Sequence, residues 1–418
     1  MRSLKYTYAE MIAARILAIG GSFGVAILTA RMLGPVDRGR YYYIITLAAV
    51  GMQFASLGIH VSNTYLVART PSLLPQIMAN TVWIALLGGA LAASGALIFD
   101  LATGTSSHDL TVVLTLMVLT PSTLLFMYLT NLVVALNRPS AYNALIIFGS
   151  LASIVLALAA ALLSPTLATF LWAAVAGSVA ASIVAWMVLA KGIQVPRLFD
   201  SELFLSGITF ALKAHIATLL GFLMSRLGIL IIRQFGNFGD VGQWSIAVQI
   251  SDAIMILPAT ISLLLFPSLV RADEANRNRE FKSTLVQLSG IMAAICLAAT
   301  VLVQPVLLFF FGAVYAPAVA IFHALLPGVF FLAVASVASQ FLSAQGYPWS
   351  QVLAWICGAA LQAALSIVLF ERIGVVGLAW VQSGCATFVC IWLLLNCLTY
   401  VRQKPSRLAD PIAPTIDP

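Results

Sequence analysis

The sequence predicts an all-α polytopic membrane protein with about twelve transmembrane helices in two six-helix lobes. Three observations predict this fold class. Of the 418 residues 61% are apolar and only 8% are charged, whereas a soluble domain carries about a quarter charged residues. Long apolar runs follow one another along the whole chain. A motif near the N-terminus recurs about half-way along the sequence, which indicates an internal duplication.

Each apolar run is long enough for a transmembrane helix, because about 20 helical residues cross the hydrocarbon core of a bilayer. Backbone hydrogen bonds must close within the segment in lipid, so the runs are predicted as helices. The predicted spans are residues 11–30, 42–66, 77–99, 110–136, 142–163, 167–190, 207–232, 241–269, 284–303, 318–343, 350–370 and 374–398. Most Lys and Arg residues fall on one side when both termini are placed in the cytoplasm, which predicts an N-in, C-in orientation.

The main exception to this charge bias is the hairpin between the first two spans, residues 30–41 (ARMLGPVDRGRY). Gly34 and Pro35 favour a tight turn, because Gly tolerates positive φ and Pro fixes its own φ. Asp37 is placed to cap the helix that follows. Three arginines and the tyrosines after them are expected at the outer membrane interface, the tyrosines as an aromatic belt: Arg31, Arg38 and Arg40, and residues 41–43.

The hairpin recurs in the second half of the chain. The R-x-x-G pattern at Arg31 returns at Arg233, and the G-x-Y pattern at Gly39 returns as G-x-W at Gly242 after one inserted residue. We therefore expect an N-terminal lobe over residues 1–200, a C-terminal lobe over 201–400 and a disordered, proline-rich cytoplasmic tail over 401–418. Two such lobes around a central cavity are a common plan among transporters.

Three stretches, taken in order, carry a family resemblance: ARMLGPVDRGRY (30–41), LLFFFGAVYAPAVAIFHALLP (307–327) and ERIGVVGLAW (371–380). Together they resemble the polysaccharide repeat-unit flippases of the multidrug/oligosaccharidyl-lipid/polysaccharide exporter superfamily. The likeness covers nearly the whole chain, including the number of helices and the duplication. The stretch QGYP (345–348) departs from the family, which usually has a basic residue before this proline.

The resemblance implies a non-enzymatic transporter of the inner (plasma) membrane. Its cargo would be a polyprenyl-diphosphate-linked oligosaccharide, flipped from the cytoplasmic to the outer leaflet by alternating access, for cell-surface or exopolysaccharide synthesis. Membrane lipid, glycan polymerase and export machinery would be its partners, and H⁺ or Na⁺ its coupling ion. Two alternatives stay open: an ion-coupled drug or lipid exporter of the same superfamily, and an integral-membrane glycan polymerase.

The exporter alternative would be expected to hold more acidic residues in its spans, where Asp252 is the only one well inside. The polymerase alternative usually needs a large outer loop, whereas the longest outer segments here are about a dozen residues. The sequence shows no Ser/His/Asp constellation, metal-ligand spacing or glycine-rich phosphate loop. We therefore predict no catalytic residue, cofactor or metal. Basic patches with interleaved aromatic residues are missing too, so no nucleic acid is expected as a partner.

Polar residues recur at helical spacing in the second, seventh and eighth spans. Intramembrane polar groups usually face a cavity or a partner, and the resemblance implies that the first, second, seventh and eighth helices line the cavity. The candidates for lining it are Arg15, His60, Asn63, His215, Arg226 and Gln249, with Asp252 as the coupling candidate and Arg31, Arg38 and Arg40 as outer-face candidates for diphosphate. The alternatives are hydrogen bonds between helices, worth about 0.6 kcal/mol each, an Arg226–Asp252 pair, and a hairpin that only anchors the chain at the headgroups.

Overall fold

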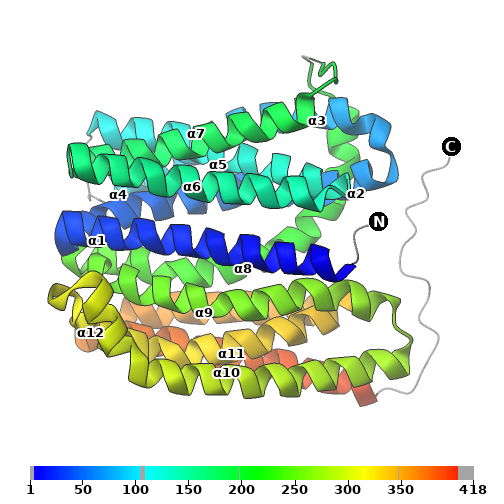
Figure 1. Ribbon diagram of the computed structural model, residues 1–418. Helices are drawn as coiled ribbons and strands as arrows, with labels where there is room; N and C mark the ends of the chain where they lie inside the picture. Colours follow the sequence, from blue (N-terminus) through cyan, green and yellow to red (C-terminus); the bar gives the residue numbers. More distant parts are fainter. Residues whose placement is uncertain (1–3, 104–108, 197, 347, 403–418) are drawn as a thin grey trace. The chain divides into compact units, whose positions relative to one another are not determined.

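The computed structural model describes residues 4–103, 109–196, 198–346 and 348–402. The side chains of residues 4–16, and of some positions within 206–217 and 263–267, lie outside what it describes. Within the described residues the chain is helical throughout and contains no strand (Figure 1). The predicted all-α fold class is therefore confirmed.

The helices follow one another with short connections. In the first half they are α1 (Leu4–Ser56), α2 (Ile59–Arg69), η1 (Pro71–Leu73), α3 (Leu74–Trp83), η2 (Ile84–Gly88), α4 (Gly89–Ala102), α5 (Leu110–Ala135), α6 (Pro139–Leu163) and α7 (Leu167–Ala190). In the second half they are α8 (Ser201–Phe235), α9 (Phe238–Arg271), α10 (Glu274–Phe311), η3 (Ala313–Tyr315), α11 (Pro317–Ala344) and α12 (Trp349–Arg402).

Ten helical stretches of the described residues are long and apolar enough to cross a membrane. Two of them, Leu17–Ser56 and Trp349–Val401, contain 40 and 53 residues, so each exceeds the roughly 20 residues of one crossing. Each is bent at a glycine with non-helical dihedrals, Gly34 in α1 and Gly374 in α12. The chain is thus a multi-pass membrane protein, while the helix count of twelve and the N-in, C-in orientation stay predictions.

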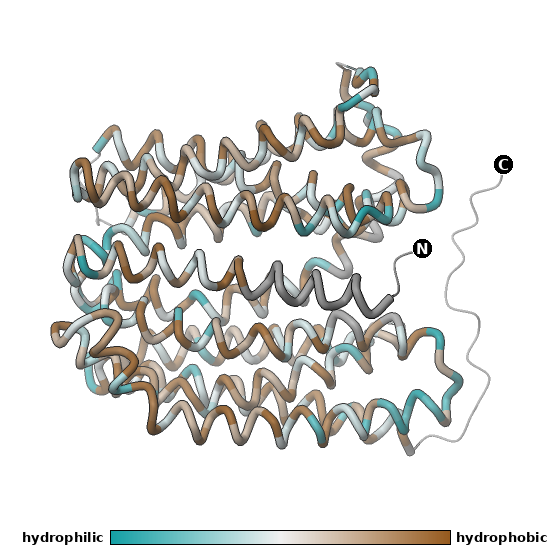
Figure 2. Tube along the Cα trace, viewed as in Figure 1, coloured by the Kyte–Doolittle hydropathy of each residue, from teal (hydrophilic) through white to brown (hydrophobic). Residues whose placement is uncertain are grey.

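Figure 2 shows apolar residues along most of each helix and hydrophilic residues gathered near helix ends, as at the turn between α9 and α10. Side-chain caps mark several of these ends. Asp109 accepts a hydrogen bond from the backbone N–H of Thr111 at the start of α5, and Asp200 accepts one from Leu203 at the start of α8, each at 3.0 Å. Such caps satisfy N–H groups that have no partner inside the helix.

The chain divides into two compact units. The first comprises Met1–Gln249 and Pro305–Ala318, and the second Ile250–Gln304 and Val319–Pro418. Within the first unit, α1 packs along α6 and against α4, α5 and α8, while α7 packs on α5 and α6. The division into lobes at residues 200 and 400 stays a prediction. Residues 403–418 of the expected disordered tail lie outside the described part of the chain.

The second predicted span, residues 42–66, is not one continuous helix. Helix α1 ends at Ser56 and α2 begins at Ile59, and the two residues between them both have positive φ, 44° at Leu57 and 69° at Gly58. A small apolar cluster surrounds this break, with Ala55 and Ile59 on either side of it and Leu124 and Tyr128 from α5. The Tyr128 hydroxyl donates to the backbone carbonyl of Ser56 at 2.9 Å, which satisfies a group freed by the break.

Candidate functional site

The opening hairpin turns where the sequence predicts. Gly34 has φ 69° and ψ 176°, a region that L-residues other than glycine rarely adopt. Pro35 then starts the second segment of α1, where its missing N–H removes no helical hydrogen bond. Asp37, expected as a cap, forms an exposed ion pair with Arg40 at 3.1 Å. Pairs of this kind contribute about 0.5 kcal/mol, so this one has little weight in holding the hairpin.

The two copies of the duplicated hairpin contact each other through their matched glycines. A Cβ atom at Gly39 would lie 1.8 Å from the carbonyl oxygen of Phe238, and one at Gly242 would lie 2.0 Å from that of Pro35. The contact is reciprocal, because each glycine admits the backbone of the opposite copy. Only a residue without a side chain fits at either position, which explains why the duplicated motif has glycine in both copies.

Aromatic and charged side chains surround this hairpin contact. The guanidinium groups of Arg40 and Arg233 lie 5.4 and 4.2 Å from the centre of the Phe238 ring, within the range of cation–π attraction. Arg31 donates from Nε to the carbonyl of Phe310 at 2.7 Å and from Nη2 to that of Phe309. It therefore satisfies the last carbonyls of α10, where a cation is favourable. Its predicted outer-face role for diphosphate stays a prediction.

Arg38 is the most informative of the three hairpin arginines, because the structure buries it. Its side chain is 1% exposed. It donates from Nη1 to the Thr29 hydroxyl at 2.6 Å and from Nη2 to Oε1 of Gln249 at 2.7 Å. The rings of Tyr41 and Tyr42 lie 5.7 and 5.3 Å from the guanidinium carbon. These partners are all neutral, so the buried Arg38 cation has no carboxylate partner among the described residues.

The expected aromatic belt is wrong for two of its three tyrosines. Tyr41 and Tyr43 are buried inside the protein, and only Tyr42 is partly exposed. The Tyr43 hydroxyl donates to Oδ1 of Asp100 at 2.9 Å, and Asp100 is itself buried on α4. Sequence reasoning missed Asp100 because a carboxylate at the very end of an apolar run has the pattern of an ordinary exposed helix end.

Arg226 joins the same polar region from α8. Its Nη1 donates to the Tyr42 hydroxyl at 3.1 Å, and its guanidinium carbon lies 5.7 Å from the centre of the Phe222 ring one turn earlier. Tyr42 thus contacts both Arg38, through its ring, and Arg226, through its oxygen. We call Thr29, Arg38, Tyr42, Arg226 and Gln249 the arginine cluster. The structure brings together three predicted site residues here: Arg38, Arg226 and Gln249.

His60, Asn63 and His215 lie in a second region, around the break between α1 and α2. His215 of α8 is buried and lies against Gly58, where an added Cβ would be 2.9 Å from the His215 Cβ. His60 is half-buried on the first turn of α2. Asn63 is buried and donates to the Thr81 hydroxyl at 3.3 Å. The break therefore lies among polar residues, with His60 and Asn63 after it on α2 and His215 against it from α8.

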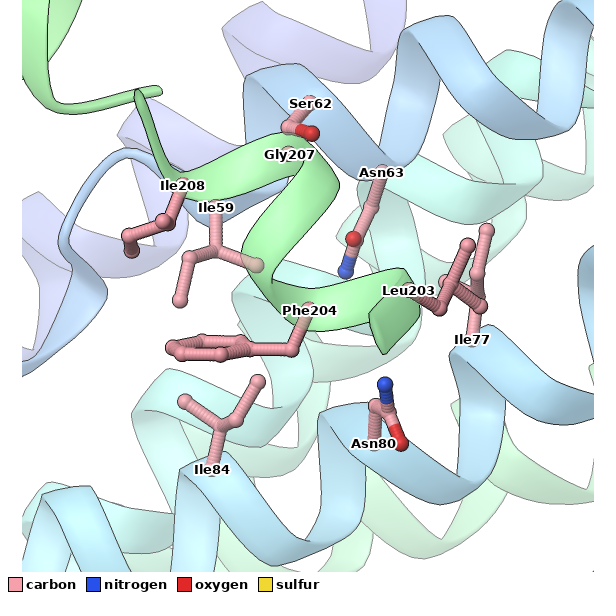
Figure 3. A pocket seen from close by; sticks show the side chains of 10 residues that line it. All are labelled: Ile59, Ser62, Asn63, Ile77, Asn80, Ile84, Leu203, Phe204, Gly207 and Ile208. Carbon is pink, nitrogen blue, oxygen red and sulfur yellow. The ribbon is translucent and has the colours of Figure 1, made fainter. Parts of the chain in front are cut away.

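A small pocket lies beside these residues, between α2, α3 and the start of α8 (Figure 3). Figure 3 shows the Phe204 ring between Ile59 and Ile84, with the amides of Asn63 and Asn80 at the other side of the pocket. The cavity volume is about 10 Å³, roughly the room that one water molecule needs. Asn80 is fully engaged, because it exchanges two 2.8 Å hydrogen bonds with the backbone of Asp200.

Two further predicted site residues, Asp252 and Arg15, belong to neither of these two regions as far as the structure describes them. Asp252 is on α9 and belongs to the second compact unit. Arg15 is on α1, but its side chain lies outside the described residues. No group of three or more His, Cys, Asp or Glu side chains that could hold a metal occurs in the part of the chain that the structure describes.

Chemically, the arginine cluster is suited to an anion. Arg guanidinium presents a rigid fork of donors that matches phosphate oxygens. Nε of Arg38 is buried without a hydrogen-bond partner among the described residues, and an unpaired buried donor is costly unless something uses it. A buried cation among neutral groups would also gain from an anion, because a nearby opposite charge offsets the cost of its desolvation.

The fold and this cluster define an all-helical, multi-pass membrane protein that holds a buried arginine among neutral partners. Residues 10–273 match the family model described as polysaccharide biosynthesis protein. The chain belongs to that family, which confirms the family resemblance of the sequence. Among curated protein sequences, no significant match occurs.

Solved structures with a similar fold include a lipid II flippase, MurJ, in an inward closed conformation. It has a TM-score of 0.74 and 16% identity, over 94% of this chain and 87% of that chain. An inward-facing multidrug resistance MATE family transporter has a TM-score of 0.73 and 11% identity, over 91% of this chain and 94% of that chain. An outward-facing multidrug resistance MATE family transporter has a TM-score of 0.68 and 11% identity, over 94% of this chain and 94% of that chain. At these identities the likeness shows the fold.

Proposed function

We propose that this protein flips a polyprenyl-diphosphate-linked oligosaccharide from the cytoplasmic to the outer leaflet of the inner membrane by alternating access. The observation that carries the proposal is the arginine cluster, two guanidinium groups joined through Tyr42 inside a multi-pass membrane protein of the polysaccharide biosynthesis family. A diphosphate is the part of such a cargo that lipid cannot solvate, and it needs cations on its route.

The two arginines would act at different stages. Arg226 is half-buried and reachable for a headgroup, so it receives the diphosphate. Arg38 is buried and directly precedes Gly39 in the contact between the two hairpins, so it meets the cargo only when the hairpins separate. The polyprenyl tail stays in lipid throughout, where each buried CH₂ contributes about 0.8 kcal/mol. The protein performs no covalent step, and H⁺ or Na⁺ drives the cycle.

The family match supports a role in polysaccharide biosynthesis. Within that role, the cargo we propose is a polysaccharide repeat unit, with glycan polymerase and export machinery acting downstream. A multidrug exporter is the second candidate, because the MATE transporter named above shares the fold. The two candidates differ in the charge that the cavity must hold. The arginine cluster suits an anionic cargo, whereas a cationic drug requires carboxylates on its route.

The test uses a strain that lacks the gene. We expect its extracted lipids to contain accumulated polyprenyl-diphosphate oligosaccharides, because synthesis continues while translocation stops. Wild type restores the normal lipid profile, whereas Arg226→Ala does not, although its membrane level is normal. Arg69→Ala is the matched control, since Arg69 is an exposed arginine at the end of α2 whose Nη1 contacts the Tyr65 hydroxyl.

A strain that accumulates no lipid-linked sugar but becomes sensitive to cationic drugs would replace the flippase proposal with the exporter. Full rescue by Arg226→Ala would remove this residue from the site and leave the cargo class to the lipid profile alone.

A further inference from the structure

The break in the second transmembrane segment is the feature of this protein that the proposed function leaves unexplained. Within that segment, Leu57 and Gly58 interrupt the helix with positive φ. Irregular backbone at membrane depth is tolerated only where protein buries it or where it lines a cavity. Interrupted helices are also the places where transporters hold coupling ions, on unwound carbonyls and helix ends. The break therefore needs a functional account.

His215 faces this break from α8. Only 4% of its surface is exposed, and neither ring nitrogen has a hydrogen-bond partner of sound geometry among the described residues. The neighbouring polar group is the backbone of Gln53, in the last turn of α1. A helix C-terminus carries partial negative charge, which offsets part of the cost of burying a protonated imidazole at this position. A hydrogen bond from a protonated ring to a carbonyl of that turn would satisfy both groups.

His60 lies opposite, two residues after Gly58. Its Nδ1 is buried and has no hydrogen-bond partner in the described part of the chain. His60 and His215 meet at Gly58: a Cβ there would lie 2.9 Å from the His215 Cβ, and His60 follows two residues later on the first turn of α2. Burial disfavours a charged imidazole, and two imidazolium groups so placed repel, so the pair accepts at most one proton before a second becomes costly.

The surroundings contain few other ionisable groups. From α5 the one ionisable side chain is Tyr128, which donates to the Ser56 carbonyl. Residues 44–56 of α1 and helices η1 and α3 contribute none. On α8, Lys213 is two residues away, with a side chain outside the described residues, and Arg226 is three turns further on. On α2, Tyr65 and Arg69 lie towards the far end.

We propose that His60 and His215 form a proton-binding site across the broken second helix, and that one proton shared by them is the coupling ion of transport. The role of this proton in transport rests on the proposed function, whereas the existence of the proton-binding site does not. Binding the proton adds a donor towards the end of α1 and sets the angle between α1 and α2. Releasing it leaves two neutral rings and frees that angle. Histidine suits this role, because its unperturbed titration lies between about pH 5 and pH 8.

The first experiment follows the imidazole carbons of ¹³C-labelled histidine by NMR, in the full-length protein in lipid nanodiscs. We expect His60 and His215 to titrate together in two steps. In His215→Gln, His60 should titrate in one step with a proton affinity about tenfold higher, because the repelling neighbour is gone. His60→Gln tests the reciprocal effect on His215, so the conclusion does not depend on one variant folding.

His323→Gln is the matched control. His323 lies on α11, and its Nε2 contacts the backbone carbonyl of Thr300 at 3.0 Å, so this variant should leave the His60 and His215 curves unchanged. A His60 curve that is the same with and without His215 would overturn the shared proton site.

The second experiment measures flipping of a fluorescent polyprenyl-diphosphate disaccharide in proteoliposomes, with and without an imposed pH gradient. The gradient should accelerate flipping several-fold in wild type and in His323→Gln, but not in His60→Gln or His215→Gln. An equal response in all four proteins would overturn the coupling. If wild type flips no substrate with or without the gradient, the proposed cargo and the proposed coupling are both rejected. The NMR titration then tests by itself whether His60 and His215 bind a shared proton.

Discussion

Arg38 shows how one side chain can be stable and still be poised for a ligand. Its two terminal nitrogens are satisfied by Thr29 and Gln249, while Nε points into the protein without a partner. The Thr29 hydroxyl accepts from Arg38 through an oxygen lone pair while it donates its own hydrogen to the Val25 carbonyl at 2.8 Å. Replacing a buried ion by an apolar residue of similar size is often neutral for stability, whereas removing only its partner is costly.

This asymmetry gives a prediction for Gln249. The Gln249→Leu variant should lower the apparent stability by about 2 kcal/mol, because it leaves a charged donor unpaired. The double variant Arg38→Met/Gln249→Leu should recover most of that loss, since no charge then stays buried. Thermal unfolding midpoints in one detergent compare the variants with wild type. Equal midpoints for Gln249→Leu and wild type would show that this hydrogen bond does not hold Arg38.

At the scale of elements, the two hairpins pack backbone against backbone. The matched glycines, Gly39 and Gly242, each lie against a carbonyl of the opposite copy. Gly39→Ala and Gly242→Ala should each destabilise the protein by about 1–3 kcal/mol, as overpacking does, and should reduce transport as the hairpins are forced apart. The measurements are the unfolding midpoint and the rescue of the deletion strain.

Gly95→Ala provides the control for these glycine variants. Gly95 lies inside α4, and a Cβ there would meet no atom within 4 Å. Alanine is the better helix former by up to about 1 kcal/mol, so the midpoint should stay or rise. Gly39→Ala behaving like Gly95→Ala would mean that the hairpins are not in tight contact.

The hairpin turn could be predicted from the sequence because it depends on local residues. The burial of Arg38 and the helix break at Leu57 could not. Glycine and proline at positions 34 and 35 specify a turn by their own dihedral preferences, so the sequence alone places it. The burial of Arg38 depends on Gln249, 211 residues away, and no local pattern reports that. The break at Leu57 was equally hidden. Leucine rarely has positive φ, and the surrounding run is as apolar as an unbroken helix.

For the whole molecule, the duplication and the two hairpins suggest where transport must change the structure. The hairpins meet at Gly39 and Gly242 in this conformation, and Arg38, which directly precedes Gly39, is buried. The alternating access that we propose requires a state in which cargo leaves at the outer side. We therefore predict that the contact between the hairpins opens once in each cycle and that holding it closed stops transport.

A cysteine pair at Val36 and Gly239 tests this prediction, because a Cβ at Gly239 would lie 3.9 Å from the Val36 side chain. The atom in question is the Val36 Cγ2, whose place a cysteine sulfur would take, so the two side chains are near enough to attempt a cross-link. In a background without the five native cysteines, oxidation should abolish flipping by Val36→Cys/Gly239→Cys, and reduction should restore it. Each single variant should keep its activity under both conditions. A cross-linked protein that still flips at the wild-type rate would place the outer gate elsewhere, and the arginine cluster would then need another route to its cargo.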